Sequence, residues 1–248
     1  MQPQKDLMKK HKPYTELAPH YDRLMSHINY EGWAAYIADN LLEYITPQSR
    51  VLEIAAGTGK LSDFLRRIFP KWYVSEYSLE MIKRADKKIT RIACDMQYLP
   101  FVNRFDAACC TFDSINYLTS VQKLLKTFRE VNSVLKTDGI FCFDVSLEKN
   151  SHRYVKYVRN EIDLPQEILS QHSWYNPESR FHYNYFYFRD SEGKLTREVH
   201  KQKIFHFDTY YDVFRKTGFE VLKVYKSFTY NKGKKSDDRI FFILRKSK

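Results

Sequence analysis

The 248-residue sequence lacks long hydrophobic runs, and no segment approaches the roughly 18 apolar residues that a membrane-spanning helix needs. It also lacks the apolar core of a secretory signal peptide, because residues 1–12 are polar and basic. From these two absences we expect no membrane partner and a location in the cytoplasm.

Cysteine is scarce and follows no metal-binding or redox pattern. The four cysteines, Cys94, Cys109, Cys110 and Cys142, lie in apolar, strand-like runs without a C-x-x-C spacing. The eight histidines are scattered and lack the spacing of metal ligands. We therefore interpret the cysteines as small buried apolar residues in a reducing compartment, and we predict no metal site.

Acidic residues are outnumbered by basic ones, which gives a formal net charge of +11. Such an excess is typical of proteins that bind nucleic acids or other anions. The basic residues are nevertheless spread out, and their densest clusters, at 9–12, 83–88, 232–235 and 245–248, contain no interleaved aromatic residues for stacking on bases. We interpret them as a solvated surface, so RNA is a possible but not a favoured partner.

Glycine is also rare, with seven residues, yet two of them stand close together after a short apolar run. Residues 51–54 predict a buried strand, Gly57 and Gly59 a tight turn, and the apolar spacing from Lys60 an amphipathic helix. Glycine allows backbone conformations that other residues resist and lets a ligand lie against the chain. This order is typical of the first unit of a doubly wound α/β domain, where ligands bind at the carboxyl ends of the strands.

Acidic residues recur at the ends of the first three predicted strands. Glu53 lies in the first strand, Glu76 ends the strand 72–76, and Asp95 follows the strand 90–94. A carboxylate at the second position can accept hydrogen bonds from both hydroxyls of a ribose.

The chain continues with strands and helices in alternation. Residues 105–112 and 140–145 predict two further parallel strands. A helix is expected between them at 120–135, terminated by the turn 136–139, which contains Gly139. The last helix, at 208–216, and the strands at 219–228 and 240–244 complete the domain, the two strands as an antiparallel pair.

Positions 53, 55, 57 and 59 read Glu, Ala, Gly and Gly, and this alternation resembles the first motif of the class I S-adenosylmethionine (SAM) dependent methyltransferases. Ala55 departs from the usual glycine, so we expect a slightly altered turn. Residues 76–81 resemble the second motif of that family, and Asp95-Met96 the third. The resemblance implies a Rossmann-like, doubly wound seven-stranded mixed sheet in an α/β fold, with SAM as cofactor and S-adenosylhomocysteine as product.

The resemblance also implies roles for single residues. Glu76 is expected to bind the ribose, Asp95 the adenine amino group, and Met81 and Met96 to pack on the adenine ring. The full set of cofactor-binding residues that we expect is Tyr14, Tyr21, Trp33, Glu53, Ala55, Gly57, Gly59, Glu76, Tyr77, Met81, Asp95, Met96 and Phe112.

The domain organisation follows from where the α/β rhythm breaks. We expect a SAM-binding domain at 1–146 and 208–248, whose residues 1–48 form a helical cap that closes over the cofactor in similar methyltransferases. Residues 147–207 are rich in aromatics and predict an antiparallel β insertion, with alternating faces along 181–188. By the same resemblance the insertion covers the substrate or forms a dimer contact, which leaves monomer or homodimer open.

The acceptor is less well defined by the sequence. We expect Tyr117, Trp174, Tyr183 and Tyr185 to bind it, and the candidates for a catalytic base are His20, Asp113, His172 and His206, among which the sequence does not choose.

The favoured function is methyl transfer to nitrogen or oxygen of a small molecule, with an RNA methyltransferase as the alternative. A nicotinamide-dependent oxidoreductase is less favoured. Residues 57–62 nearly fit G-x-G-x-x-G/A, but Ser62 and the acid Glu53 do not belong to that pattern. A binding module without activity is a further alternative.

Overall fold

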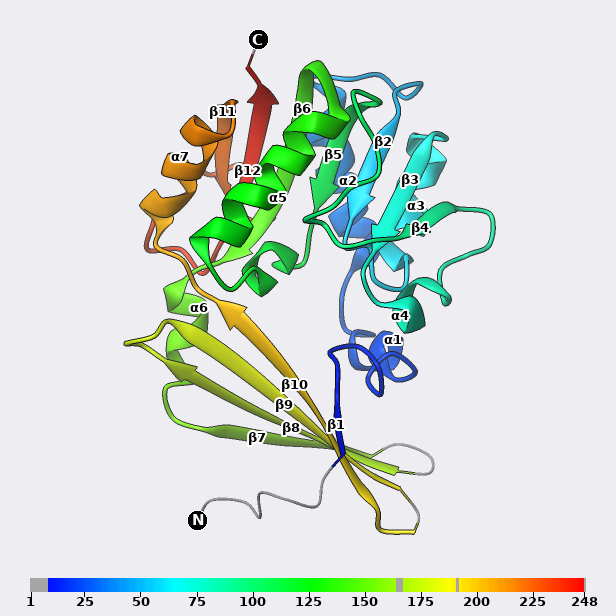
Figure 1. Ribbon diagram of the computed structural model, residues 1–248, viewed down its shortest axis with the longest axis vertical. Helices are drawn as coiled ribbons and strands as arrows, with labels where there is room; N and C mark the ends of the chain where they lie inside the picture. Colours follow the sequence, from blue (N-terminus) through cyan, green and yellow to red (C-terminus); the bar gives the residue numbers. More distant parts are fainter. Residues whose placement is uncertain (1–8, 164–166, 191, 248) are drawn as a thin grey trace.

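Two β-sheets organise the computed structural model, which describes residues 9–163, 167–190 and 192–247 (Figure 1). The larger sheet has seven strands in the order β11-β12-β6-β5-β2-β3-β4, and the smaller has five in the order β1-β10-β9-β8-β7. Residues 1–8, which include the start of the predicted cap, lie outside the described residues.

The larger sheet confirms the predicted Rossmann-like architecture. Its strands are β2 (Val51–Ile54), β3 (Trp72–Glu76), β4 (Thr90–Ala93), β5 (Phe105–Cys110), β6 (Leu135–Ser146), β11 (Phe219–Lys226) and β12 (Arg239–Lys246). The first five run parallel, and β11 and β12 form the predicted antiparallel pair. The chain moves outward from β2 to β4 and then returns to β5 on the other side of β2, so a crevice opens at the carboxyl ends of these strands.

Helices cover both faces of this sheet, as a doubly wound fold requires (Figure 1). They are α2 (Tyr30–Leu42), α3 (Lys60–Ile68), α4 (Leu79–Ile82), α5 (Val121–Val134) and α7 (Phe207–Lys216). One buried cluster includes Phe128, Phe143 and Phe214, and a second on the other face includes Ile37 and Leu65. Among the described residues, no helix has both the length and the apolar character needed to cross a bilayer.

One predicted boundary is wrong. The helix was expected to end near 135 and α5 ends at Val134, but the fifth strand was expected to start at 140 after a turn, and β6 already starts at Leu135. In this segment Asp138 has a left-handed backbone conformation, with φ 59°. The register of β6 against β5 shifts between Leu135 and Ile140. Gly139 therefore lies inside a strand that bends.

The smaller sheet lies below the carboxyl ends of the main sheet (Figure 1). It contains β7 (Val158–Asp163), β8 (Glu167–Asn176), β9 (Phe181–Asp190) and β10 (Leu195–Lys203), all antiparallel, and β1 (Lys9–His11) pairs in parallel with β10. We call this the insertion sheet. The sequence did not predict β1 or β7.

The region before α2 is less helical than predicted. Within residues 12–29 the structure describes one helix, α1 (Tyr21–Leu24), which is a single turn. The other residues of this segment form turns. We call residues 12–29 the cap segment. It links β1 of the insertion sheet to α2 of the main domain.

The two faces of the insertion sheet follow the predicted alternation. Phe186 and Phe188 are buried on the inner face, where they pack with Leu17 of the cap segment. The register pairs Tyr183 with Lys201 and Tyr185 with Val199, and these residues lie on the opposite, outer face.

The two sheets are joined by the buried side chain of Asn116, in the 3₁₀ helix η1 (Ser114–Tyr117). Its Oδ1 accepts a hydrogen bond from the N–H of Ser146 at 2.9 Å, and its Nδ2 donates to the carbonyl of Lys203 at 2.9 Å. One side chain thus satisfies backbone groups at the end of β6 and at the end of β10.

We predict that Asn116→Ala lowers the free energy of unfolding by about 3 kcal/mol, because it leaves buried backbone groups without partners. Urea denaturation measures this change. The matched control is Asn231→Ala at an exposed position, which should cost less than about 0.5 kcal/mol. Equal losses in the two variants would contradict the role given to Asn116.

Candidate active site

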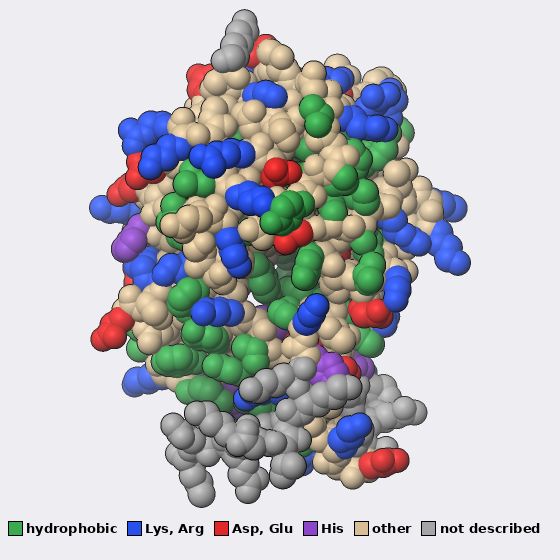
Figure 2. Space-filling model, viewed as in Figure 1, with side chains coloured by type: hydrophobic (Ala, Val, Ile, Leu, Met, Phe, Trp, Pro, Cys, Tyr) green, Lys and Arg blue, Asp and Glu red, His purple; other side chains and the backbone are tan. Residues whose placement is uncertain are grey.

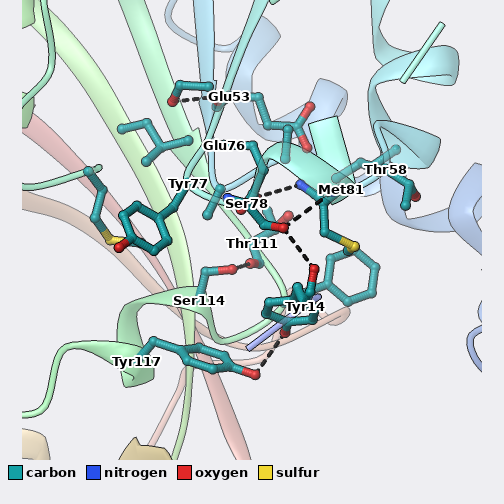
Figure 3. Close-up of a pocket in the computed structure, with 18 of the residues that line it drawn as sticks. Tyr14, Glu53, Thr58, Glu76, Tyr77, Ser78, Met81, Thr111, Ser114 and Tyr117 are labelled. Atoms are coloured by element: carbon teal, nitrogen blue, oxygen red, sulfur yellow. Dashed lines mark hydrogen bonds between the residues drawn. The ribbon is translucent and has the colours of Figure 1, made fainter. Parts of the chain in front are cut away.

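A cavity lies between the carboxyl ends of β2 and β3 and Tyr14 of the cap segment (Figure 3). We call it the first cavity. Of the predicted cofactor-binding residues, it is lined by Tyr14, Tyr21, Glu53, Ala55, Gly57, Glu76, Tyr77, Met81, Asp95, Met96 and Phe112. Trp33 and Gly59 are the two that do not line it.

The turn after β2 depends on left-handed backbone at three positions. Gly57 has φ 60° and Gly59 has φ 76°, whereas Ala55 adopts φ 56° despite its methyl group, at a cost on the order of 1 kcal/mol. A Cβ atom on Gly59 would lie 3.0 Å from the Cβ of Ala85. Gly59 therefore allows the turn to pack against the segment after α4, and does not contact the cavity.

Glu76 presents a fixed carboxylate to the first cavity. Its Oε1 accepts from the N–H of Ser78 at 2.8 Å, and its Oε2 accepts from the N–H of Gly57 at 2.9 Å. Burial raises the pKa of Glu76, and the two N–H groups oppose that rise. Each oxygen keeps acceptor capacity for a ligand hydroxyl.

The buried side chain of Glu53 forms hydrogen bonds in the core near the end of β2, where the first cavity begins. Its Oε2 accepts from the Oγ of Ser62 at 2.5 Å and from the Nε1 of Trp72 at 2.8 Å. Burial raises the pKa of Glu53 to about 7, although both donors favour the ionised form. Ser62, which does not fit the dinucleotide-binding pattern, is thus a partner of the motif acid.

The cap segment is tied to the glycine turn and to the end of β3. Ser78 Oγ donates to the carbonyl of Tyr14 at 2.9 Å, as Figure 3 shows, and Thr58 Oγ1 donates to Asp22 Oδ1 at 2.6 Å. Lys60 Nζ lies 3.6 Å from the other carboxylate oxygen of Asp22. These contacts close the first cavity on the side of Tyr14.

A second cavity shares part of its wall with the first. Tyr14, Tyr21, Phe112 and Tyr117 line both. The remaining wall comes from the cap segment, the inner face of the insertion sheet and the main domain: Leu17, Leu24, Met25, His27, Ile28, Trp33, Asp113, Gln171, Asn184, Phe186, His200, Gln202 and Arg239. The predicted Trp33 belongs here, where its ring stacks on Phe112 at 3.9 Å.

Asp113 lies at the base of the second cavity in a network of charges. Its Oδ1 is 2.5 Å from Arg239 Nη2, and its Oδ2 accepts from Gln202 Nε2 at 2.6 Å. Arg239 also bonds to the buried Asp144. Burial opposes the charge of Arg239, but the two aspartates outweigh it and raise the pKa of Arg239. Asp113 and Arg239 line the second cavity as an ion pair, whereas Asp144 does not line it.

The backbone that carries Asp113 is strained. Phe112 has φ 58° and Asp113 has φ 47°, two successive left-handed residues without glycine. Such conformations cost about 1–3 kcal/mol each and persist where surrounding contacts fix them. This backbone conformation places the side chain of Phe112 in the wall that both cavities share and the carboxylate of Asp113 beside Arg239.

A chain of short hydrogen bonds leads from the shared wall into the insertion sheet. The hydroxyls of Tyr14 and Tyr117 lie 2.7 Å apart, as Figure 3 shows, and Tyr117 lies 2.7 Å from His200 Nδ1. His200 Nε2 lies 2.6 Å from Glu198 Oε1. The side chains of His200 and Glu198 are 2% and 0% exposed, so water does not compete for the bond between them.

Several predicted acceptor residues need correction. Trp174, Tyr183 and Tyr185 lie on the outer face of the insertion sheet and line neither cavity. The alternation was read correctly, but the inward face is the other one, because the buried Phe186 and Phe188 pack against the cap segment. Of the predicted acceptor residues, Tyr117 lines both cavities.

The predicted candidates for the catalytic base also fall into residues that line a cavity and residues that do not. Asp113 lines the second cavity, whereas His20, His172 and His206 line neither. His172 is on the outer face, bonded to Tyr157, and His206 is exposed before α7. Sequence reasoning missed His200, although Glu198, His200 and Gln202 alternate on the face that carries Phe186.

Comparison with known proteins agrees with this geometry. Residues 51–139 match the family model described as a methyltransferase domain. The putative methyltransferase YqeM of Bacillus subtilis is 29% identical over 95% of this chain and 98% of its own length.

Two solved structures share the fold over nearly the whole chain. A SAM-dependent methyltransferase from Clostridium acetobutylicum has a TM-score of 0.80 at 22% identity, covering 95% of this chain and 99% of its own. SAM-bound CalS10, an amino pentose methyltransferase from Micromonospora echinaspora, has a TM-score of 0.71 at 18% identity, covering 98% and 100%.

The sheet order, the glycine turn and the acids at successive strand ends are those of a Rossmann-like α/β fold with a cavity at the carboxyl ends of its strands. Residues 51–139 thus carry a methyltransferase domain, and the chain is similar over nearly its whole length to proteins described as methyltransferases, a SAM-dependent one among them.

We predict that Glu53→Gln removes a pH dependence of stability. The native pKa of Glu53, about 7, exceeds its ordinary value of 4.5. The native state therefore binds more protons between these values, and stability falls as pH rises through that window. Full ionisation costs on the order of 3 kcal/mol.

Urea denaturation without cofactor at pH 5 and pH 8 measures the effect. The amide oxygen of the Glu53→Gln variant keeps an acceptor for Ser62 and Trp72, so this variant should lose less stability between the two pH values than the parent. Glu80→Gln, on the exposed side of α4, is the control and should behave as the parent. Identical pH dependence in parent and Glu53→Gln would show that Glu53 titrates normally.

Proposed function

We propose that this methyltransferase transfers the methyl group of SAM to nitrogen or oxygen of a small molecule that binds in the second cavity. The observation that carries the proposal is the wall of Tyr14, Tyr21, Phe112 and Tyr117 that the two cavities share. In-line displacement needs the methyl donor and the nucleophile to meet at one point, and a shared wall is such a point.

The first cavity fits SAM in the residues that it offers. Gly57 leaves room beside Met81, since an added Cβ would lie 3.3 Å from the Met81 Cε atom. In the proposal Glu76 accepts both ribose hydroxyls, Asp95 accepts the adenine amino group, and Met81 and Met96 pack on the ring. When bound, SAM supplies an activated methyl group on a cationic sulfur, near which aromatic rings are favourable.

The distribution of charge supports a small acceptor over RNA. None of the lysines at 83–88 or 232–235 lines either cavity. On the face drawn in Figure 2, Lys and Arg side chains are spread out and do not form one patch. An RNA-tracking site needs cations beside the reacting group. The four free cysteines, three of them buried, accord with our proposal of a reducing cytoplasmic location.

Labelled SAM tests the acceptor class directly. We expect labelling in a small-metabolite pool and none in total RNA, both at physiological salt. Robust labelling of one RNA position would reverse the proposal.

For the cofactor site, we predict that Glu76→Ala weakens SAM binding by roughly 2–3 kcal/mol, because it removes a charged acceptor for two hydroxyls. Calorimetry with SAM measures the loss, and Glu76→Asp should lose less. Glu80→Ala removes an exposed acid from the same region and is the control. Unchanged SAM affinity in folded Glu76→Ala would exclude the ribose role.

For the acceptor site, we predict that Ile28→Trp abolishes most methyl transfer while SAM affinity stays the same. Ile28 lines the second cavity and not the first, so a larger side chain there takes only acceptor space. Turnover with the active metabolite fraction and calorimetry with SAM are compared. Val102→Trp, at a position 80% exposed, should retain both, and parental turnover in Ile28→Trp would place the acceptor elsewhere.

A further inference from the structure

The hydrogen-bond chain between the shared wall and Glu198 has a fixed direction. The carboxylate of Glu198 accepts from the N–H groups of four successive residues, Tyr14 at 2.5 Å, Thr15 at 3.0 Å, Glu16 at 2.8 Å and Leu17 at 3.2 Å. Donors of this kind stabilise the ionised form. Burial raises the pKa of Glu198, but His200 and the backbone N–H groups outweigh it and leave that pKa lowered. Glu198 is therefore an acceptor only.

The direction of the chain follows from Glu198 when His200 is in the neutral form that a base requires. Since Glu198 accepts, the Nε2 atom then carries the proton and Nδ1 accepts. Tyr117 then donates to Nδ1, and the Tyr117 oxygen accepts from the hydroxyl of Tyr14. Among the residues that the structure describes, none donates to the remaining lone pairs of the Tyr14 oxygen, and Tyr14 lines both cavities.

We infer that Tyr14, Tyr117 and His200 form a proton wire that deprotonates the acceptor, with His200 as the base and Tyr14 as the group that contacts the nucleophile. The inference rests on the proposed function and adds a substrate class to it, an amine bound as its ammonium form. An ammonium group suits the site because the Tyr14 oxygen has lone pairs that accept an N–H donor.

The step balances without another reactant. One N–H bond of the ammonium breaks, its proton passes to Tyr14, that of Tyr14 to Tyr117, and that of Tyr117 to His200 Nδ1. The electron pair left on nitrogen forms the N–CH₃ bond as the S–CH₃ bond breaks, and the sulfonium charge ends on the methylated nitrogen. The imidazolium pairs with Glu198, and after the product leaves the proton passes back along the wire to water that enters the cavity.

Burial raises the pKa of both Tyr14 and Tyr117 well above the ordinary value of a phenol. Neither residue therefore stores a negative charge, and the protons move together. The charged and titratable groups that face His200 are Glu198 on its own strand, Tyr14 from the cap segment and Tyr117 from η1. Asp113 and Arg239 lie farther along the same cavity.

The first test detects the proton wire in the absence of a methyl acceptor. Nitrogen-15 NMR of histidine-labelled protein with S-adenosylhomocysteine should show one buried histidine in the Nε2–H tautomer, absent from His200→Gln. Tyr117→Phe should change the Nδ1 shift of that histidine, and Tyr187→Phe, which removes a phenol from the outer face, should not. An Nδ1–H tautomer would overturn the inference even if methyl transfer is confirmed.

The second test is kinetic and uses the metabolite pool divided on a cation exchanger. We expect labelled methyl groups in the retained amine fraction, and labelling confined to the neutral fraction would overturn the inference. His200→Gln should lower kcat about 100-fold with unchanged SAM affinity, and the deficit should shrink as pH rises, since the amine then loses its proton in solution.

A purely structural role for His200 would give a deficit that does not depend on pH, and would also overturn the inference. If His200→Gln does not fold, Tyr117→Phe provides the same comparison. The absence of labelling in every fraction would contradict the proposed function, while the tautomer measurement would still decide whether the wire exists.

Discussion

Glu198 accepts hydrogen bonds from four successive backbone N–H groups of the cap segment and from His200, on a side chain with no exposed surface. A buried carboxylate is costly unless its oxygens are satisfied. At this position they are satisfied only while the cap segment lies against the insertion sheet. The ionised side chain therefore makes the closed arrangement of the two cavities a condition of stability.

The other contacts of the cap segment extend this constraint to the cofactor site. Tyr14 is held by Glu198 through its N–H and by Ser78 through its carbonyl, and Asp22 is held by Thr58 of the glycine turn. Polar contacts therefore connect the insertion sheet, the cap segment and the glycine turn. The shared wall of the two cavities lies among these contacts, which explains why its four aromatic residues come from such distant parts of the sequence.

Local patterns in the sequence were sufficient for the main sheet and for most of the first cavity. Val51 to Ile54, the turn at Gly57, and the acids Glu53, Glu76 and Asp95 are each encoded within a few residues, because strand, turn and helix follow one another there. Trp33 was assigned to the cofactor because the cap of similar methyltransferases closes over it, but Trp33 stacks on Phe112 and lines the second cavity.

For the insertion sheet, local patterns in the sequence do not determine which face turns inward. Alternation along β9 separates Tyr183 and Tyr185 from Phe186 and Phe188, but it contains no information on which face turns inward. That choice is made by Leu17 and the cap segment, far away in the sequence. β1 could not be predicted for the same reason, because three residues without apolar periodicity become a strand only through pairing with β10.

The bond between Tyr14 and Glu198 joins residues 184 positions apart, and this separation has a consequence for how the molecule is made. During synthesis the cap segment leaves the ribosome long before its partner carboxylate exists. Contacts so distant in the sequence form late, after loop closure over much of the chain. The glycine turn and its parallel strands can assemble earlier, but a closed active site appears only when β10 has been added. A chain released too early therefore resembles a methyltransferase in its core and lacks the enclosure that the reaction requires.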